Sequence, residues 1–224
     1  MWLFPKKTPK SKPDPLTIDY LWSCKNELTW KQALNHYYEL LSHEQEALDR
    51  RMETLDASKI KNLSPKDFYQ FLHQEYFVWK YTQKNRLAIT RKNLEKYTIE
   101  NRLQELADIQ HLLFRTKHSD IAGCLTVATR IRGLGIAGAS GLLAVLFPAD
   151  FGVVDQFVVK SLLKIEFLSE HDLLSRMKPE MLALKDGVVL TCILRQKADA
   201  LNKLFHTNFW TPRKIDMILW SIER

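Results

Sequence analysis

The sequence predicts an all-α fold of about ten helices, because apolar residues recur at three- and four-residue spacing through most of the chain. Helix start signals support this assignment. Ser64-Pro65 and Thr211-Pro212 each place a capping hydroxyl before a proline, the order that favours a helix N-terminus. No stretch has the alternating pattern and turn residues of a β-hairpin, and no internal repeat is evident.

Length and composition limit the possible classes of protein. The chain has 224 residues, 46% of them hydrophobic, which is enough for one large or two small domains with a real core. No apolar run is long enough to cross a bilayer and the N-terminus lacks the apolar core of a signal peptide, so we expect a cytoplasmic protein with no membrane partner. The three widely spaced cysteines indicate neither a disulfide framework nor a metal site. A net charge of +7 suits a polyanionic partner.

Residues 1–16 are predicted to form a flexible basic arm, in which lysines alternate with prolines. Residues 17–224 are predicted to form a single domain. Its first part, residues 17–58, is helical in pattern, with Thr29 as a plausible cap.

The next predicted helix, Phe68–Tyr81, follows the Ser64-Pro65 signal and has aromatic side chains on nearly all sides, which indicates a central, buried helix. After it, Lys80–Lys96 holds six basic residues against the single acid Glu95. This run is either a solvated helix face or a face that contacts phosphates. Glu100–Leu113 is predicted to be another amphipathic helix.

The C-terminal part is also predicted to be helical. Short helices are expected over Ser169–Ser175 and Lys178–Leu184, a break or kink at Gly187, and a long helix over Val188–Phe205. A final helix begins at Thr211-Pro212 and ends near Trp220.

The most informative stretch is Ile131–Leu163. A helical pattern over 120–131 leads into Gly133-Leu134-Gly135, an apolar helical run follows, and Pro148 ends that run. Two glycines one residue apart let the backbone turn tightly and approach a ligand, and a helix N-terminus just after them attracts anions. The glycines alone favour a purely geometric role, because many helix–helix turns contain glycine.

The spacing from this turn to Asp155 changes that interpretation. Ile131-Arg132-Gly133-Leu134-Gly135-Ile136-Ala137-Gly138-Ala139, followed by Val153-Val154-Asp155, resembles the helix-hairpin-helix DNA glycosylase superfamily, the group of endonuclease III and the mismatch adenine glycosylases. Aligning the glycines places Asp155 on the family's catalytic aspartate without a gap. The resemblance implies two helical lobes with a cleft between them and a helix-hairpin-helix motif at 120–147.

Departures from the family pattern narrow the expected activity. Ala137 stands where lyase members carry a nucleophilic lysine, and alanine supplies no amine. Arg132 replaces a proline, and Gly138 replaces a threonine or serine. We therefore expect a monofunctional glycosylase without lyase activity. Three cysteines cannot supply the four-cysteine iron–sulfur cluster of some members.

The resemblance also implies a set of binding roles. The hairpin would grip a phosphate of double-stranded DNA, and its carbonyls could hold a monovalent cation; no other cofactor and no nucleotide cofactor is expected. Asp155 would stabilise the sugar cation that forms when the base leaves, or would simply cap the following helix. Tyr76, Trp79 and Lys80 are candidates for the base pocket, with core packing as the alternative for the aromatic residues. We expect a monomer. The predicted hairpin residues are Arg132, Gly133, Leu134, Gly135, Ile136, Ala137 and Gly138.

Three other functions remain open at this level. The chain could be a non-catalytic helix-hairpin-helix protein that binds DNA or abasic sites. It could be a lyase that uses a different amine, Lys80 or Lys160. It could also be a helical scaffold for protein partners, with an incidental basic surface.

Overall fold

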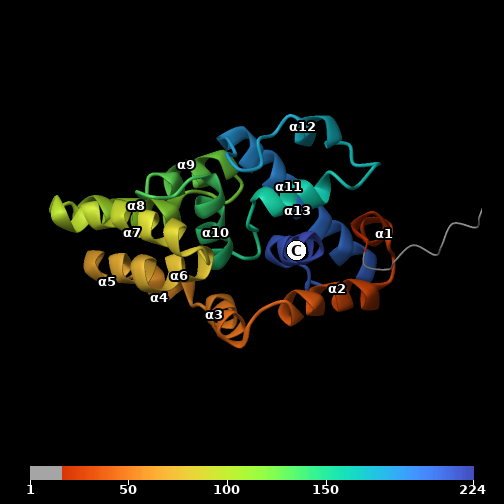
Figure 1. Ribbon diagram of the computed structural model, residues 1–224, viewed down its shortest axis with the longest axis horizontal. Helices are drawn as coiled ribbons and strands as arrows, with labels where there is room; N and C mark the ends of the chain where they lie inside the picture. Colours follow the sequence, from red (N-terminus) through yellow and green to blue (C-terminus); the bar gives the residue numbers. More distant parts are fainter. Residues whose placement is uncertain (1–16) are drawn as a thin grey trace, which may run out of the picture.

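The computed structural model describes residues 17–224, and the predicted basic arm lies outside this range. Every regular element among the described residues is a helix, which confirms the all-α class (Figure 1). No helix among them is long and apolar enough to span a membrane.

The first half of the described chain forms short and medium helices. They are α1 (Ile18–Ser23), α2 (Glu27–Glu39), α3 (His43–Glu53), α4 (Ala57–Lys61), α5 (Pro65–Gln70), the π-helical segment η1 (Phe71–Tyr76), α6 (Phe77–Lys80) and α7 (Lys84–Ile99). The second half contains α8 (Leu103–Arg115), α9 (Ile121–Thr129), α10 (Ile136–Leu146), α11 (Gln156–Leu162), α12 (His171–Ser175), α13 (Leu184–Phe205) and α14 (Pro212–Glu223).

Short polar side chains set most of the N-terminal helix boundaries. The side chains of Asn26, Ser42 and Asp56 cap α2, α3 and α4, so the predicted helical region 17–58 is divided into several helices. Thr29 was expected to cap but lies inside α2, because the Asn26 side chain already accepts the Leu28 amide at 2.9 Å.

The aromatic helix is confirmed as a central, buried element. Residues 65–80 form one uninterrupted helical column, from the Ser64 cap through η1 to Lys80. Phe68, Tyr76 and Phe77 are fully buried. The π-helical turn was not predicted; such turns occur frequently at functional sites.

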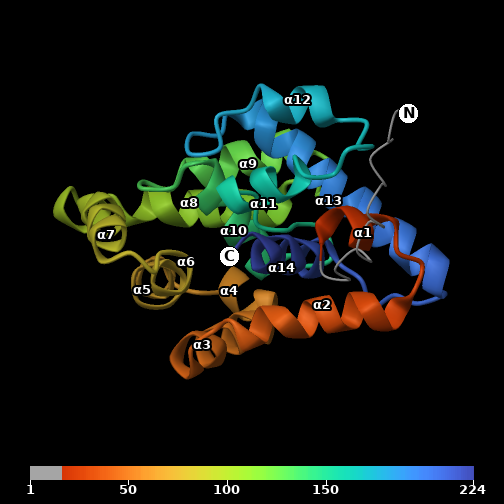
Figure 2. The ribbon, with the colours of Figure 1, turned by 45° about the vertical axis from the view of Figure 1, so that its right-hand side comes forward.

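Buried apolar side chains form two clusters. The first comes from α4 to α10 with Met52 of α3; the second comes from α1, α2 and α11 to α14. Helix α2, near the start of the described chain, therefore packs against α14 at its end (Figure 2). The chain passes from the first cluster to the second between Val153 and Val154, directly before Asp155.

Helix α13 connects the two clusters, since it contacts α9 and α10 on one side and α14 on the other. Gly187 was predicted to be a break or a kink, and the break is wrong, because this residue lies inside α13. A Cβ at Gly187 would come within 2.7 Å of Ile136, so the glycine permits close packing against the start of α10. The helix predicted over Lys178–Leu184 is also absent; α13 begins only at Leu184.

Candidate functional site

The glycine turn between α9 and α10 combines a left-handed residue with an exposed helix start. Gly133 has φ +98°, and a Cβ there would lie 2.9 Å from the Thr90 carbonyl, so only glycine fits without strain. Gly135 is the N-cap of α10, no side chain caps the helix, and a Cβ at Gly135 would meet nothing within 4 Å. The backbone at Gly135 is therefore open to an approaching partner.

The side chains predicted to contact DNA from this turn mostly face the protein. Leu134 and Gly138 are buried, and a Cβ at Gly138 would clash with the Tyr81 hydroxyl. The Arg132 guanidinium donates to Glu100 at 2.7 Å and lies over the Tyr97 ring. Backbone groups at Gly135, Ile136 and Ala137, which are exposed or half-buried, remain the outward part of the turn.

The carbonyls of the turn were also considered as ligands for a monovalent cation. Those of Ile131 and Gly135 each already accept a backbone hydrogen bond, from Leu134 and Ala139.

Two buried polar side chains hold the loop that leads to Asp155. The Ser140 hydroxyl, on α10, accepts the Val154 amide at 3.0 Å and lies 3.2 Å from the Ala137 carbonyl, to which it donates. The Asp216 carboxylate, on α14, accepts the Val153 amide at 2.6 Å. Both residues before Asp155 are thus fixed by side chains from separate helices, which sets its position relative to the glycine turn.

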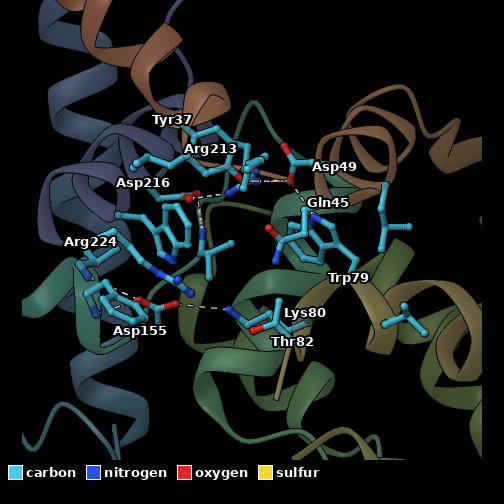
Figure 3. Close-up of a pocket in the computed structure, with 18 residues that line it drawn as sticks. Tyr37, Gln45, Asp49, Trp79, Lys80, Thr82, Asp155, Arg213, Asp216 and Arg224 are labelled. Atoms are coloured by element: carbon cyan, nitrogen blue, oxygen red, sulfur yellow. Dashed lines mark hydrogen bonds and ion pairs between the residues drawn. The ribbon is translucent and has the colours of Figure 1, made fainter. Parts of the chain in front are cut away.

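Asp155 uses its two carboxylate oxygens differently. Oδ1 accepts the amides of Phe157 at 3.0 Å and Val158 at 3.5 Å, which caps α11. Oδ2 lies 3.5 Å from the Lys80 ammonium nitrogen (Figure 3). The predicted capping role is therefore present, and it leaves the second oxygen available for another role.

Lys80 reaches Asp155 from the end of α6. Its side chain is 11% exposed, and its Cδ and Cε lie 3.1 and 3.3 Å from where a Cβ at Gly141 would be. The missing side chain at Gly141 thus makes room for the lysine stem. Lys160, the other lysine considered, instead lies near Gln156 at 3.2 Å and Glu180 at 3.9 Å.

A pocket of about 190 Å³ surrounds the Lys80–Asp155 pair and is lined by residues from both apolar clusters. An engineered cavity of about 150 Å³ binds benzene, so this pocket accommodates a small ring system. Figure 3 draws the residues that line it. They include Tyr37, Asp49, Trp79, Lys80, Val153, Asp155, Phe157, Arg213, Asp216, Trp220 and Arg224.

A buried ionic network forms one wall of the pocket. Arg213 donates to Asp216 at 2.6 Å and to Asp49 at 3.0 Å. Asp49 also accepts the Trp79 indole N–H at 2.7 Å and the Tyr37 hydroxyl at 3.0 Å. Burial raises the pKa of Asp216 to about 7, while Arg213 and the Val153 amide act in the opposite direction. The network thus connects Trp79 to Val153, in the loop that leads to Asp155.

Two of the three residues predicted to line the base pocket lie at this pocket, and the third does not. Trp79 and Lys80 line the pocket. Tyr76 does not: it is fully buried, and its hydroxyl donates to the Gly138 carbonyl, so its role is to join α10 to the aromatic helix. Glu75, an acid on the same helix, does not line the pocket; its carboxylate pairs with Arg51 at 2.9 Å.

Sequence reasoning missed the residues that hold the site in place. None of the three gave a motif: Ser140 and Asp216 are single polar residues between apolar neighbours, and Asp49 is one of many charged residues in its segment. The sequence did contain a signal for one pair: Arg213 and Asp216 stand three residues apart on a helix whose other inward positions are mostly apolar.

Among residues 17–224, no group of three or more His, Cys, Asp or Glu side chains could hold a metal ion. Comparisons of the chain with protein-family models, with curated proteins and with solved structures found no match in any of the three.

Proposed function

We propose that the protein is a monofunctional DNA glycosylase, which hydrolyses the bond between a damaged or modified base and its sugar in duplex DNA. One observation carries the proposal. Asp155 keeps a carboxylate oxygen in a pocket of ring-system size, at the end of a loop anchored to the helix that follows an open glycine turn.

The glycine turn and α7 together supply a surface for DNA phosphates. The open backbone at Gly135, at the N-terminus of the 11-residue helix α10, favours an anion. Lys96 of α7 lies with Gly133 on the wall of a neighbouring groove. The exposed basic residues of α7 extend this surface; they are Lys84, Arg86, Lys92 and Lys96.

Asp155 would act on the sugar. Breaking the N-glycosidic bond builds positive charge at C1′ and on the ring oxygen, and a fixed carboxylate stabilises this charge. The same carboxylate can accept a proton from the attacking water. Ala137 offers no nucleophile at the turn, so the expected product is an abasic site in an intact strand.

The test is excision from a panel of duplexes that contain uracil, alkylated purines, oxidised bases, mismatches or a preformed abasic site. Each reaction is analysed with and without hot alkali. Strand cleavage that requires alkali, on at least one base substrate, supports the proposal. No base release from any duplex, together with salt-sensitive duplex binding, would instead favour a non-catalytic DNA-binding protein.

A lyase is the second candidate, because the Lys80 nitrogen lies 3.5 Å from Asp155. An amine at this place could attack C1′ and form a Schiff base. Trapping with borohydride on DNA that contains an abasic site distinguishes the two activities, since only the lyase yields a covalent adduct.

A further inference from the structure

We propose that Lys80 donates a proton to the departing base and recovers it through Asp155, and that the site is therefore built for bases that are uncharged in DNA. This inference rests on the proposed glycosylase function and specifies its substrate class.

Lys80 is the only lysine that lines the pocket in the described part of the chain. Its side chain is 11% exposed, and that of Asp155 is 18% exposed, so both groups are largely shielded from bulk water. Low solvent access strengthens the interaction of each group with a bound ligand. The space left by Gly141 holds the lysine stem against α10 and directs the ammonium group to the carboxylate.

The other two acidic groups of the pocket belong to the arginine network. Asp49 is ion-paired with Arg213, and its Oδ1 accepts three hydrogen bonds while its buried Oδ2 has no hydrogen-bond partner among residues 17–224. Asp216 accepts Arg213 and the Val153 amide. Glu75 pairs with Arg51 outside the pocket. Lys80 lines the pocket and contacts the Asp155 carboxylate with its ammonium group, so it can pass a proton to both places.

The aromatic walls argue against a cationic base. The four aromatic side chains of the pocket each already have an arginine over the ring. Arg213 lies 5.8 Å from the Tyr37 centroid and 5.2 Å from that of Trp79. Arg224 lies 5.7 Å from the Phe157 centroid and 4.7 Å from that of Trp220. A positively charged base would meet like charges beside these rings instead of an unoccupied cation–π site.

The bond from C1′ to the base nitrogen breaks, its electron pair stays on the base, and the Lys80 ammonium gives that base a proton. Water adds to C1′ of the sugar cation and passes one proton to Asp155. Asp155 then returns this proton to the Lys80 amine across the 3.5 Å contact. One water is consumed, and the free base and an abasic sugar are the products.

The test compares Lys80→Met, Lys80→Arg and the control Lys160→Met with the wild type in single-turnover excision. Two duplexes are used: one with the uncharged base that the wild type removes fastest, and one with N7-methylguanine, which leaves without needing a proton. Lys80→Met is expected to slow removal of the uncharged base roughly 100-fold, the usual size of general acid catalysis. Removal of N7-methylguanine is expected to be slow in the wild type, because arginines already lie over the pocket rings, and to have the same rate in Lys80→Met.

Lys80→Arg separates proton donation from positioning. Arginine keeps a positive charge beside Asp155 but gives up a proton poorly, so we expect it not to restore removal of the uncharged base. Full rescue by arginine would overturn the inference, because Lys80 would then only position Asp155. It would also be overturned by an equal loss on both duplexes, by no loss in Lys80→Met, or by a borohydride adduct that requires Lys80.

Failure of the inference can be told apart from failure of the proposed function. A wild type that removes only cationic bases leaves the glycosylase function standing and rejects this assignment of Lys80. A wild type that removes no base rejects both.

Discussion

The hydroxyl of Ser140 on α10 accepts a 3.0 Å hydrogen bond from the amide of Val154, the residue immediately before Asp155. This contact joins the helix that begins at the glycine turn to the loop that carries the candidate catalytic carboxylate. The distance between the glycine turn and Asp155 thus depends on this buried side chain, together with the Asp216 carboxylate that holds Val153.

Ser140→Ala tests this connection. The substitution leaves the buried Val154 amide without its partner, so we expect the free energy of unfolding to fall by about 1–3 kcal/mol in urea titrations. The excision rate should fall more than DNA affinity, because Asp155 loses its fixed position. Ser161→Ala is the matched control: Ser161 is equally buried, and its hydroxyl has no hydrogen-bond partner among the described residues. A similar loss of stability and of excision rate in both variants would argue against this role of the Ser140 hydroxyl.

Arg213→Met tests the buried ionic network. Removing the guanidinium leaves two buried carboxylates, Asp49 and Asp216, without their cation. Loss of one partner from a buried pair costs about 3–5 kcal/mol of folding free energy, which denaturant titration can measure. The exposed Arg115, changed to methionine, should alter stability by less than about 0.5 kcal/mol. A change at Arg213 no larger than that at Arg115 would show that the network contributes little.

The glycine turn gives a prediction that separates folding from DNA binding. Gly135→Ala adds a methyl group into open space, so stability should change by less than about 1 kcal/mol. The methyl group obstructs close approach of a phosphate, and we expect duplex affinity to fall roughly tenfold at low salt. Gly133→Ala, by contrast, should destabilise the fold, because of its φ of +98° and the nearby Thr90 carbonyl. Unchanged duplex affinity in Gly135→Ala would exclude the turn from the DNA contact.

Lys197 gives a prediction for the pH dependence of stability. Burial lowers its pKa from 10.5 to about 8, and its ammonium group lies over the rings of Trp22 and Trp30. Between these two pH values the unfolded chain binds more protons than the folded one, so this group makes stability rise with pH. The rise is at most about 1.4 kcal/mol per pH unit, and partial solvent access reduces it.

The measurement is the unfolding free energy of the wild type and of Lys197→Met from about pH 7.5 to 9.5, compared as a difference at each pH so that titration of other groups cancels. The difference between the two proteins should grow in favour of the wild type as pH rises. A difference that stays constant, or that shrinks as pH rises, would contradict a lowered pKa of Lys197.

The sequence was sufficient to predict the local elements of the site. The helix starts at Ser64 and Thr211 could be predicted, because a capping residue bonds to backbone amides only a few positions away in the chain. The glycine turn at Gly133 and the helix start at Asp155 could be predicted because they too depend on residues that are close in the sequence.

What the sequence did not predict depends on contacts between distant segments. Lys80 and Asp155 are 75 residues apart, and Asp49 and Arg213 are 164 residues apart. Gly187 was interpreted as a break because a glycine weakens an isolated helix, but its packing against Ile136 is a tertiary effect. Tyr76 was predicted to line the base pocket, but its hydroxyl donates to the Gly138 carbonyl, which is distant in the sequence.

Asp155→Asn tests the central claim most directly. Asparagine caps a helix about as well as aspartate, so α11 should remain intact and duplex binding should be unchanged. The charge that stabilises the sugar cation is lost, and we expect single-turnover excision to fall by roughly 100- to 1,000-fold. Excision at the wild-type rate by a correctly folded Asp155→Asn protein would contradict the account.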